Sequence, residues 1–187
     1  MKLSHLPNAI TIGRMAFVPL LILMLKDGRF LGALCIFLVA GVSDALDGYI
    51  AKHFGCTSRL GAILDPVADK VLLVSAYVML AWLHLIPFWL VLAVVFRDLL
   101  IVGGYLVYVS LYGPVQMHPS YVSKFNTFVQ ILLVLFLLAQ RALEFRVPYA
   151  NELLVFSVLA TTLASGLHYV WTWGVMKDIE VTGGKQS

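Results

Sequence analysis

The sequence alternates between long apolar stretches and short polar connectors. Six of the apolar stretches are close to or above the roughly 20 residues that an α-helix needs to cross a bilayer. They run over Ala9–Leu25, Phe30–Ile50, Leu60–Leu83, Pro87–Tyr112, Ser120–Arg141 and Pro148–Val175. Their apolar character is continuous, unlike the alternation over about 10 residues that membrane barrel strands show. The pattern therefore predicts an all-α, polytopic membrane protein with six transmembrane helices in a single domain over residues 1–187.

The distribution of Lys and Arg over the connectors indicates how these helices are oriented. Six helices place both termini on one side, together with the second and fourth connectors. That side carries Lys2, Arg14, Lys52, Arg59, Lys70, Lys124, Lys177 and Lys185. The other side carries Lys26, Arg29, Arg141 and Arg146. Because basic residues accumulate in cytoplasmic loops, eight against four predicts that both termini are cytoplasmic.

The composition supports a membrane protein. Of the 187 residues, 61% are hydrophobic and 12% are charged, whereas a soluble domain has about 45–50% apolar and about 25% charged residues. The apolar segment Met15–Leu25 is not followed by a small-residue cleavage site, so we expect a retained helix and not a signal peptide. No Arg- and Ser-rich transit segment precedes it. This favours a bacterial inner membrane, with the mitochondrial inner membrane as the alternative. From the apolar composition we expect membrane lipids, and not nucleic acid, as partners.

Four aspartates interrupt the apolar pattern between residues 43 and 70. Asp44 and Asp47 are three residues apart at the end of the second predicted helix, and Asp65 and Asp69 are four apart near the start of the third. Both spacings put a pair on one helical face. Because a short connector joins the two helices, they are expected to form an antiparallel hairpin in which all four carboxylates converge at one membrane boundary.

Such a cluster is costly unless cations neutralise it. An Asp at a helix centre costs about 2.5–3.5 kcal/mol on insertion scales, and like charges close together repel. Oxygen ligands without His or Cys suit Mg²⁺, Mn²⁺ or Ca²⁺ better than zinc. The alternative is that the aspartates cap helices or pair with Lys52, Arg59 and Lys70. Capping accounts for Asp65 alone, but Asp44 and Asp47 lie near a helix C-terminus, where the dipole disfavours them.

Two glycines accompany the aspartates. Gly48 follows Asp47, and Gly61 lies one turn before Asp65. A glycine in a helix interior costs about 1 kcal/mol relative to alanine, so it often marks the close approach of another group. A bound nucleotide or diphosphate and close helix packing both account for them.

These residues together resemble the signature of the CDP-alcohol phosphatidyltransferase family, D-x2-D-G-x2-A-R-x8-G-x3-D-x3-D. Seven of its eight defined positions match, with all spacings intact. The matching residues are Asp44, Asp47, Gly48, Ala51, Gly61, Asp65 and Asp69. Lys52 stands where the family has Arg, which keeps the charge but loses a bidentate contact to phosphate.

The resemblance implies a six-helix fold, a cavity open to the cytoplasmic leaflet, and a homodimer. It implies two divalent ions, Mg²⁺ or Mn²⁺, bound by Asp44, Asp47, Asp65 and Asp69, with Asp69 also acting as the base on the acceptor hydroxyl. It further implies that Gly48, Lys52 and Gly61 contact the cytidine and the diphosphate of CDP-diacylglycerol.

Other segments resemble particular members of the family. Leu6–Arg14 has the family's P-N-x-x-T-x-x-R pattern, and Phe96–Leu99 and Ser123–Gln130 resemble segments of the eukaryotic-type cardiolipin synthases. The bacterial phosphatidylglycerophosphate synthases share an S-x-x-G-K-x-K-T feature, but they carry a second cation after Arg-Glu in the fourth helix. Here Arg97-Asp98 is followed by no second cation, and Gly103 and Gly104 leave room for a glycerol backbone.

A singly charged lipid phosphodiester needs fewer basic partners than glycerol-3-phosphate. We therefore expect phosphatidylglycerol as the acceptor, giving cardiolipin and CMP, with glycerol-3-phosphate as the alternative. Arg97 and Lys124 are the candidates for binding the acceptor phosphate. The alternatives are that Arg97 pairs with Asp98 or with a site aspartate, and that Lys124 extends to the membrane interface. Asn126 and Gln130 share a helix face and either bind a headgroup or hydrogen-bond between helices.

Transport is the competing class of function, because intramembrane aspartates also mark proton and cation pathways. Transporters commonly place acidic groups near the midplane, on broken helices and in repeats. The aspartates here are expected near one boundary, and the sequence has no internal repeat. The pattern favours the enzyme.

Overall fold

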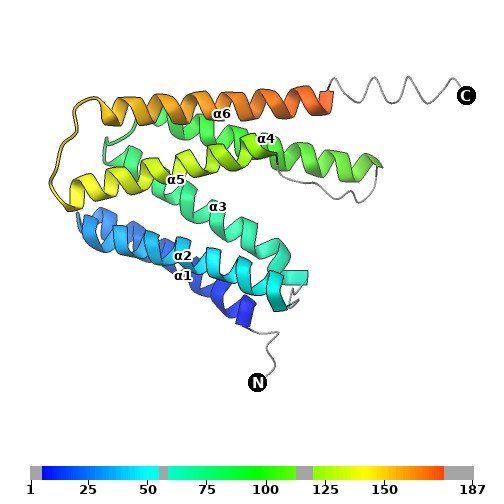
Figure 1. The fold of residues 1–187 in the computed structure, drawn as a ribbon, viewed down its shortest axis with the longest axis horizontal. Coiled ribbons are helices and arrows are strands. Elements are labelled where there is room, and N and C mark those ends of the chain that lie inside the picture. The colour runs from blue at the N-terminus through cyan, green and yellow to red at the C-terminus, as the bar shows by residue number, and fades with distance from the viewer. Residues whose placement is uncertain (1–5, 55–58, 113–119, 175–187) are drawn as a thin grey trace, which may run out of the picture. The chain divides into compact units, whose positions relative to one another are not determined.

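The computed structural model describes residues 6–54, 59–112 and 120–174, with side chains described for residue 13 and for 15–43, 70–104 and 120–171. This part of the chain is all-helical (Figure 1). Its helices are α1 (Leu6–Lys26), α2 (Phe30–Phe54), α3 (Arg59–Trp82), α4 (Phe88–Tyr112), α5 (Tyr121–Ala142) and α6 (Ala150–Gly174). The predicted all-α class and the six helices are confirmed, and every predicted boundary lies within four residues of the observed one.

Glycine and proline mark two of the helix boundaries. Gly28 has φ 71°, and the amides of Gly28 and Arg29 donate to the carbonyls of Leu25 and Met24 at 3.2 and 2.8 Å. This pair of hydrogen bonds is the Schellman motif. The motif favours glycine at the position of Gly28, because glycine adopts the left-handed conformation without strain. Pro87 directly precedes α4, where its fixed φ suits the start of a helix.

The helices fall into two compact units. Unit 1 comprises Met1–Pro87 and Val134–Pro148, and unit 2 comprises Phe88–Leu133 and Tyr149–Ser187. In unit 1, α1 packs against both α2 and α3. Buried apolar side chains from all three helices form the core, including Leu21, Phe37 and Tyr77. A Cβ added at Gly32 would lie 3.0 Å from the sulfur of Met24, so this glycine lets the Met24 side chain of α1 pack closely against α2.

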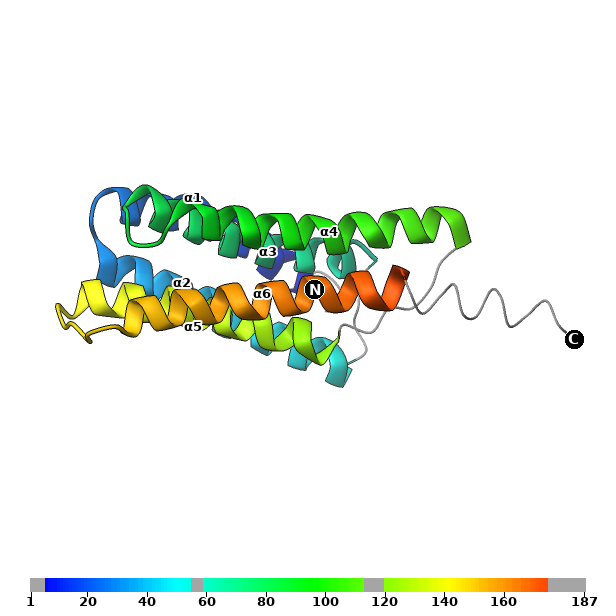
Figure 2. The same cartoon turned by 90° about the horizontal axis from the view of Figure 1, so that it is seen from above.

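In unit 2, α4 and α6 pack against each other and run in the same direction (Figures 1 and 2). The first part of α5, up to Leu133, belongs to this unit and runs the opposite way. Leu90 and Val94 of α4, Leu133 of α5 and Val158 of α6 are fully buried. Among the described side chains, the buried polar and charged ones all belong to unit 2, namely Arg97, Asn126, Gln130, Thr162 and Ser165.

Two of the described helices are long and apolar enough to span a membrane, namely Tyr121–Ala142 and Ala150–Trp171. Only 39% and 22% of their apolar windows are buried. A core helix of a soluble protein would be mostly buried, so the exposed apolar faces suit lipid contact. Trp82 of α3, Phe96 of α4 and Leu167 of α6 are 78%, 66% and 69% exposed. The six spans, the orientation of the termini and the single domain stay predictions.

Candidate functional site

The four aspartates lie on two neighbouring helices of unit 1. Asp44 and Asp47 belong to α2, and Asp65 and Asp69 belong to α3, which runs in the opposite direction (Figure 1). The end of α2 and the start of α3 are five residues apart in sequence, so their Cα atoms are at most about 18 Å apart.

The positions of the aspartates along the two helices correspond. At 1.5 Å per residue, Asp47 lies about 10 Å before the end of α2 and Asp65 about 9 Å after the start of α3. Asp44 and Asp69 both lie about 15 Å from the same helix ends. Counted along each helix from the connector, the two pairs therefore lie at similar distances from it, as the predicted ion-binding hairpin requires.

The side chains of these four residues lie outside the described part, as do those of Gly48, Lys52 and Gly61. Gly48 and Lys52 belong to α2 and Gly61 to α3. Among the side chains that are described, no group of three or more His, Cys, Asp or Glu is close enough to hold a metal. The assignment of ions to the aspartates stays a prediction, supported by helix placement and by the oxygen chemistry of the donor set.

The described side chains show a second polar site in unit 2, which we call the arginine cluster and define as Arg97, Asp98, Ser123 and Ser165. Arg97 of α4 is 3% exposed. Its Nη1 donates to the Asp98 carboxylate at 2.8 Å, and its Nη2 donates to Ser123 Oγ of α5 at 2.6 Å. Its Nε donates to Ser165 Oγ of α6 at 3.2 Å, and Nη2 donates to the same hydroxyl. One guanidinium thus bonds to all three helices of the unit.

The hydrogen bonds within the arginine cluster use most of the N–H donors of the Arg97 guanidinium. A guanidinium carries five N–H groups, and four hydrogen bonds within the cluster engage them. A charge buried in an apolar environment is tolerated when it is paired and hydrogen-bonded. The proposed pairing of Arg97 with Asp98 is confirmed, and the role of Arg97 toward an acceptor phosphate stays a prediction.

One helical turn from the arginine cluster is a buried amide site, formed by Asn126, Thr161 and Thr162. Asn126 is fully buried, and its Oδ1 accepts from Thr161 Oγ1 at 2.9 Å and from Thr162 Oγ1 at 3.0 Å. Its Nδ2 has no hydrogen-bond partner among the described residues. The interpretation of Asn126 as an interhelical hydrogen-bonding residue is confirmed for its oxygen. Gln130, also fully buried, lies one turn further along α5.

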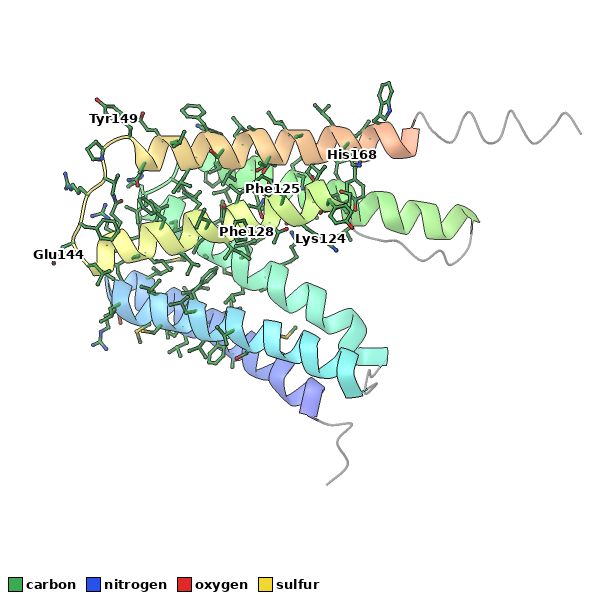
Figure 3. The ribbon with its side chains drawn as sticks, in the orientation of Figure 1. Lys124, Phe125, Phe128, Glu144, Tyr149 and His168 are labelled. Carbon is green, nitrogen blue, oxygen red and sulfur yellow. The ribbon has the colours of Figure 1, made fainter. Side chains whose placement is uncertain are left out.

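Lys124 differs from Arg97 in being exposed. Its Nζ lies 5.6 Å from the centre of the Tyr121 ring, within the range of a cation–π contact. Figure 3 shows Lys124 near the start of α5 and His168 near the end of α6, toward the same end of unit 2. Lys124 directly follows Ser123 on α5, so the backbone that carries this accessible cation adjoins the arginine cluster.

Sequence reasoning did not single out the hydroxyls that complete these sites. Thr161 and Ser165 repeat at four-residue spacing on α6, after Ser157. A row of hydroxyls on one face of an apolar helix was the available signal. It is ambiguous, because Ser157 only donates to the Leu153 carbonyl of its own helix at 2.7 Å.

The chain is all-α and exposes apolar helix faces. It carries an acidic motif on two helices and buries an arginine. These features together are more typical of a membrane-associated enzyme than of a soluble protein. Comparison with known proteins identifies the family. Residues 4–171 match the CDP-alcohol phosphatidyltransferase family, and the chain belongs to it. The family recognised from the aspartate signature is confirmed. The family generally uses divalent metal ions and takes CDP-diacylglycerol and alcohol acceptors as substrates.

The chain is similar to two groups of curated relatives. It is 34% identical over 93% of its length to a cardiolipin synthase (CMP-forming)/mitochondrial hydrolase fusion protein of Schizosaccharomyces pombe, of which the match covers 32%. It is 32% identical over 96% of its length to the cardiolipin synthase (CMP-forming) of Rattus norvegicus, covering 64% of that protein. It is 30% identical over 92% to the CDP-diacylglycerol–glycerol-3-phosphate 3-phosphatidyltransferase of Bacillus subtilis, covering 97%.

The match thus spans less than two thirds of the eukaryotic relatives and nearly all of the bacterial one. The relatives include both activities expected from the sequence, that of the cardiolipin synthases and that of the glycerol-3-phosphate enzymes. Identity near one third to both groups does not by itself separate them.

Proposed function

We propose that this protein transfers the phosphatidyl group of CDP-diacylglycerol to phosphatidylglycerol, releasing CMP and forming cardiolipin. The observation that carries the proposal is family membership over residues 4–171 together with the aspartate pairs at similar distances from the connector on α2 and α3. The second candidate is the same transfer to glycerol-3-phosphate, which the Bacillus subtilis relative favours.

In the proposed reaction, the primary hydroxyl oxygen of the acceptor headgroup attacks the phosphorus that carries diacylglycerol. The bond from that phosphorus to the bridging oxygen of CMP breaks, and the oxygen leaves with its electron pair. The Asp69 carboxylate takes the hydroxyl proton. Asp44, Asp47, Asp65 and Asp69 would hold the divalent ions, Mg²⁺ or Mn²⁺, which supply charge neutralisation at the diphosphate and the leaving group. Gly48, Lys52 and Gly61 would contact the nucleotide.

The arginine cluster supports a singly charged acceptor. Four hydrogen bonds already engage the Arg97 guanidinium, and Asp98 balances its charge. The remaining cation beside it is Lys124, which is exposed and screened by solvent. A phosphate dianion would be held by several charge-assisted bonds, whereas a phosphodiester monoanion needs fewer. We therefore favour the lipid and assign its phosphodiester to the vicinity of Arg97 and Lys124.

The space along α4 also supports a lipid. A Cβ added at Gly103 or Gly104 would meet nothing within 4 Å. Helix packing within the described chain thus does not require these glycines, and we assign the open space beside them to an acceptor lipid. We further propose that the enzyme is a homodimer with six spans and cytoplasmic termini in a bacterial inner membrane, with the mitochondrial inner membrane as the alternative.

The test is an acceptor assay with purified protein in mixed micelles that contain CDP-diacylglycerol. CMP release is measured with phosphatidylglycerol or with glycerol-3-phosphate, each with Mg²⁺, with Mn²⁺ or with EDTA. We expect CMP and cardiolipin with phosphatidylglycerol only, and no product with EDTA. Exclusive use of glycerol-3-phosphate would establish the second candidate. Product formation at full rate with EDTA would contradict the assigned ions.

A further inference from the structure

The amide site of unit 2 contains a buried donor that has no acceptor among the described residues. Asn126 is 0% exposed, and its buried Nδ2 has no hydrogen-bond partner among the described residues. A buried donor left unsatisfied costs about 1–3 kcal/mol, and the apolar interior of a membrane offers little water to compensate it. A partner outside the chain is therefore expected for this N–H group.

The hydroxyls on α6 determine which end of the amide faces them. Thr161 has one hydroxyl hydrogen and also lies 2.9 Å from the Ser157 carbonyl, so it has an alternative acceptor. Thr162, which is 2% exposed, donates only to Asn126 Oδ1 among the hydrogen bonds of the described residues. Turning the amide around would leave the Thr162 hydrogen without that acceptor. The oxygen thus faces α6, and Nδ2 is the end of the amide that has no partner among the described residues.

The surroundings determine which kind of oxygen suits this donor. Ser123 and Asn126 are one turn apart on α5, as are Thr162 and Ser165 on α6, so the amide site lies about 5 Å along the helices from the arginine cluster. The Arg97–Asp98 pair has no net charge, and the amide adds none. The nearby cation Lys124 is exposed and screened by solvent. A neutral donor beside a single screened cation suits an uncharged oxygen better than a phosphate dianion.

We propose that Asn126 is a specificity-determining residue, whose Nδ2 donates a hydrogen bond to an uncharged oxygen in the glycerol part of the lipid acceptor. The inference rests on the proposed function. The acceptor's phosphodiester lies beside Arg97 and Lys124, and the oxygen bonded by Asn126 is one helical turn away. That oxygen is either the secondary hydroxyl of the headgroup or an ester carbonyl of the diacylglycerol part.

The test combines Asn126→Leu with acceptors that lack one kind of oxygen. Three acceptors are compared, namely phosphatidylglycerol, phosphatidyl-1,3-propanediol, which lacks the secondary hydroxyl, and dialkyl-ether phosphatidylglycerol, which lacks the ester carbonyls. All three keep the primary hydroxyl that attacks. With phosphatidylglycerol we expect Asn126→Leu to raise KM roughly three- to tenfold, the range for one neutral hydrogen bond, with little change in kcat.

The analogue that lacks the bonded oxygen should raise the KM of the wild type by the same three- to tenfold factor, and it should not raise the KM of Asn126→Leu any further. The analogue with this result identifies the oxygen that Asn126 bonds. Asn126→Asp, which keeps an acceptor for the two threonines but removes the donor, should behave like Asn126→Leu. Ser157→Ala is the matched control, because that hydroxyl bonds only its own helix, and it should change neither KM nor kcat.

Three results would overturn the inference. One is an equal loss on all three acceptors, which indicates a structural role. Another is an unchanged KM in Asn126→Leu. The third is full activity of Asn126→Asp, which would show that the amide oxygen faces the ligand. Failure of the wild type to use any of the lipids would instead overturn the proposed function, so the two failures are distinguishable.

Discussion

Arg97 in unit 2 and the four aspartates in unit 1 are both costly residues in helices this apolar, but their surroundings differ. Arg97 has a carboxylate at the next position and hydroxyls from two other helices, and four hydrogen bonds engage it within its own unit. None of the four aspartates has a Lys or Arg three or four residues away on its own helix, where side chains meet.

The difference indicates which charged residues stabilise the fold and which serve chemistry. A charge that its own unit neutralises holds helices together and keeps few donors for a ligand. A group of like charges that outnumbers the cations near it in the sequence depends on further cations from elsewhere. By this criterion we predict that the aspartates are the catalytic region, and in unit 2 the amide nitrogen of Asn126 is a better ligand candidate than the guanidinium of Arg97.

The largest effect is expected at the aspartates. Asp69→Asn should lower kcat by about 10²–10⁴-fold, the usual contribution of a general base, as measured by CMP release. Wild-type protein should also melt at a lower temperature in EDTA than in Mg²⁺, because bound ions stabilise the folded state.

In Asp44→Asn the difference in melting temperature between Mg²⁺ and EDTA should shrink, since one ligand and one repelling charge are removed. Asp27→Asn, an exposed carboxylate in the connector before α2, is the control and should leave both measurements unchanged. If Asp69→Asn were fully active, or if EDTA left the melting temperature unchanged, the aspartates would not be the ion site, and the contrast between the two units would disappear.

Most of the fold could be predicted from the sequence because apolar length is a strong signal. A run of about 20 apolar residues specifies a helix whatever its neighbours are, and Gly28 and Pro87 mark two of the boundaries. Packing partners were not predictable in this way. An apolar helix has no single face to bury, so nothing in the pattern of α1 specifies that it contacts both α2 and α3.

The candidate site was predictable to a different degree in each unit. The aspartate motif is local, so its spacing could be recognised without the fold. The arginine cluster is assembled from residues 26 and 68 positions away from Arg97. Serine in an apolar helix often bonds its own backbone, as Ser157 does, and only the three-dimensional arrangement distinguishes Ser165 from it.

An intermediate effect is expected when the arginine cluster is broken. Arg97→Met leaves the partly buried Asp98 carboxylate without its guanidinium. Removing one partner of a buried ion pair typically costs about 3–5 kcal/mol of unfolding free energy. Adding Asp98→Asn should restore a good part of that loss, because an amide is less costly to bury than a lone charge. Denaturant titration in mixed micelles measures both.

Arg97→Lys serves as the matched variant. It keeps the charge but lacks the planar fork that reaches Asp98, Ser123 and Ser165 together, so it should be less stable than wild type and more stable than Arg97→Met. An Arg97→Met protein as stable as wild type, but with a strongly raised KM for the acceptor, would show that the guanidinium serves substrate binding. That result would place Arg97 with the aspartates.

The smallest effect is expected at Lys124, the accessible cation beside the arginine cluster. Because solvent and salt screen an exposed charge, Lys124→Gln should raise the KM for phosphatidylglycerol only about two- to threefold at low salt, within the usual weak range of exposed ion pairs. The effect should fade at high salt, and the melting temperature should not change. Lys26→Gln, at the exposed end of α1, is the matched control and should alter neither the KM nor the melting temperature.

If Lys124→Gln raised KM tenfold or more at high salt, the lysine would be desolvated against the acceptor phosphate. Unit 2 would then contain a strong anion site after all, and glycerol-3-phosphate would become the better acceptor.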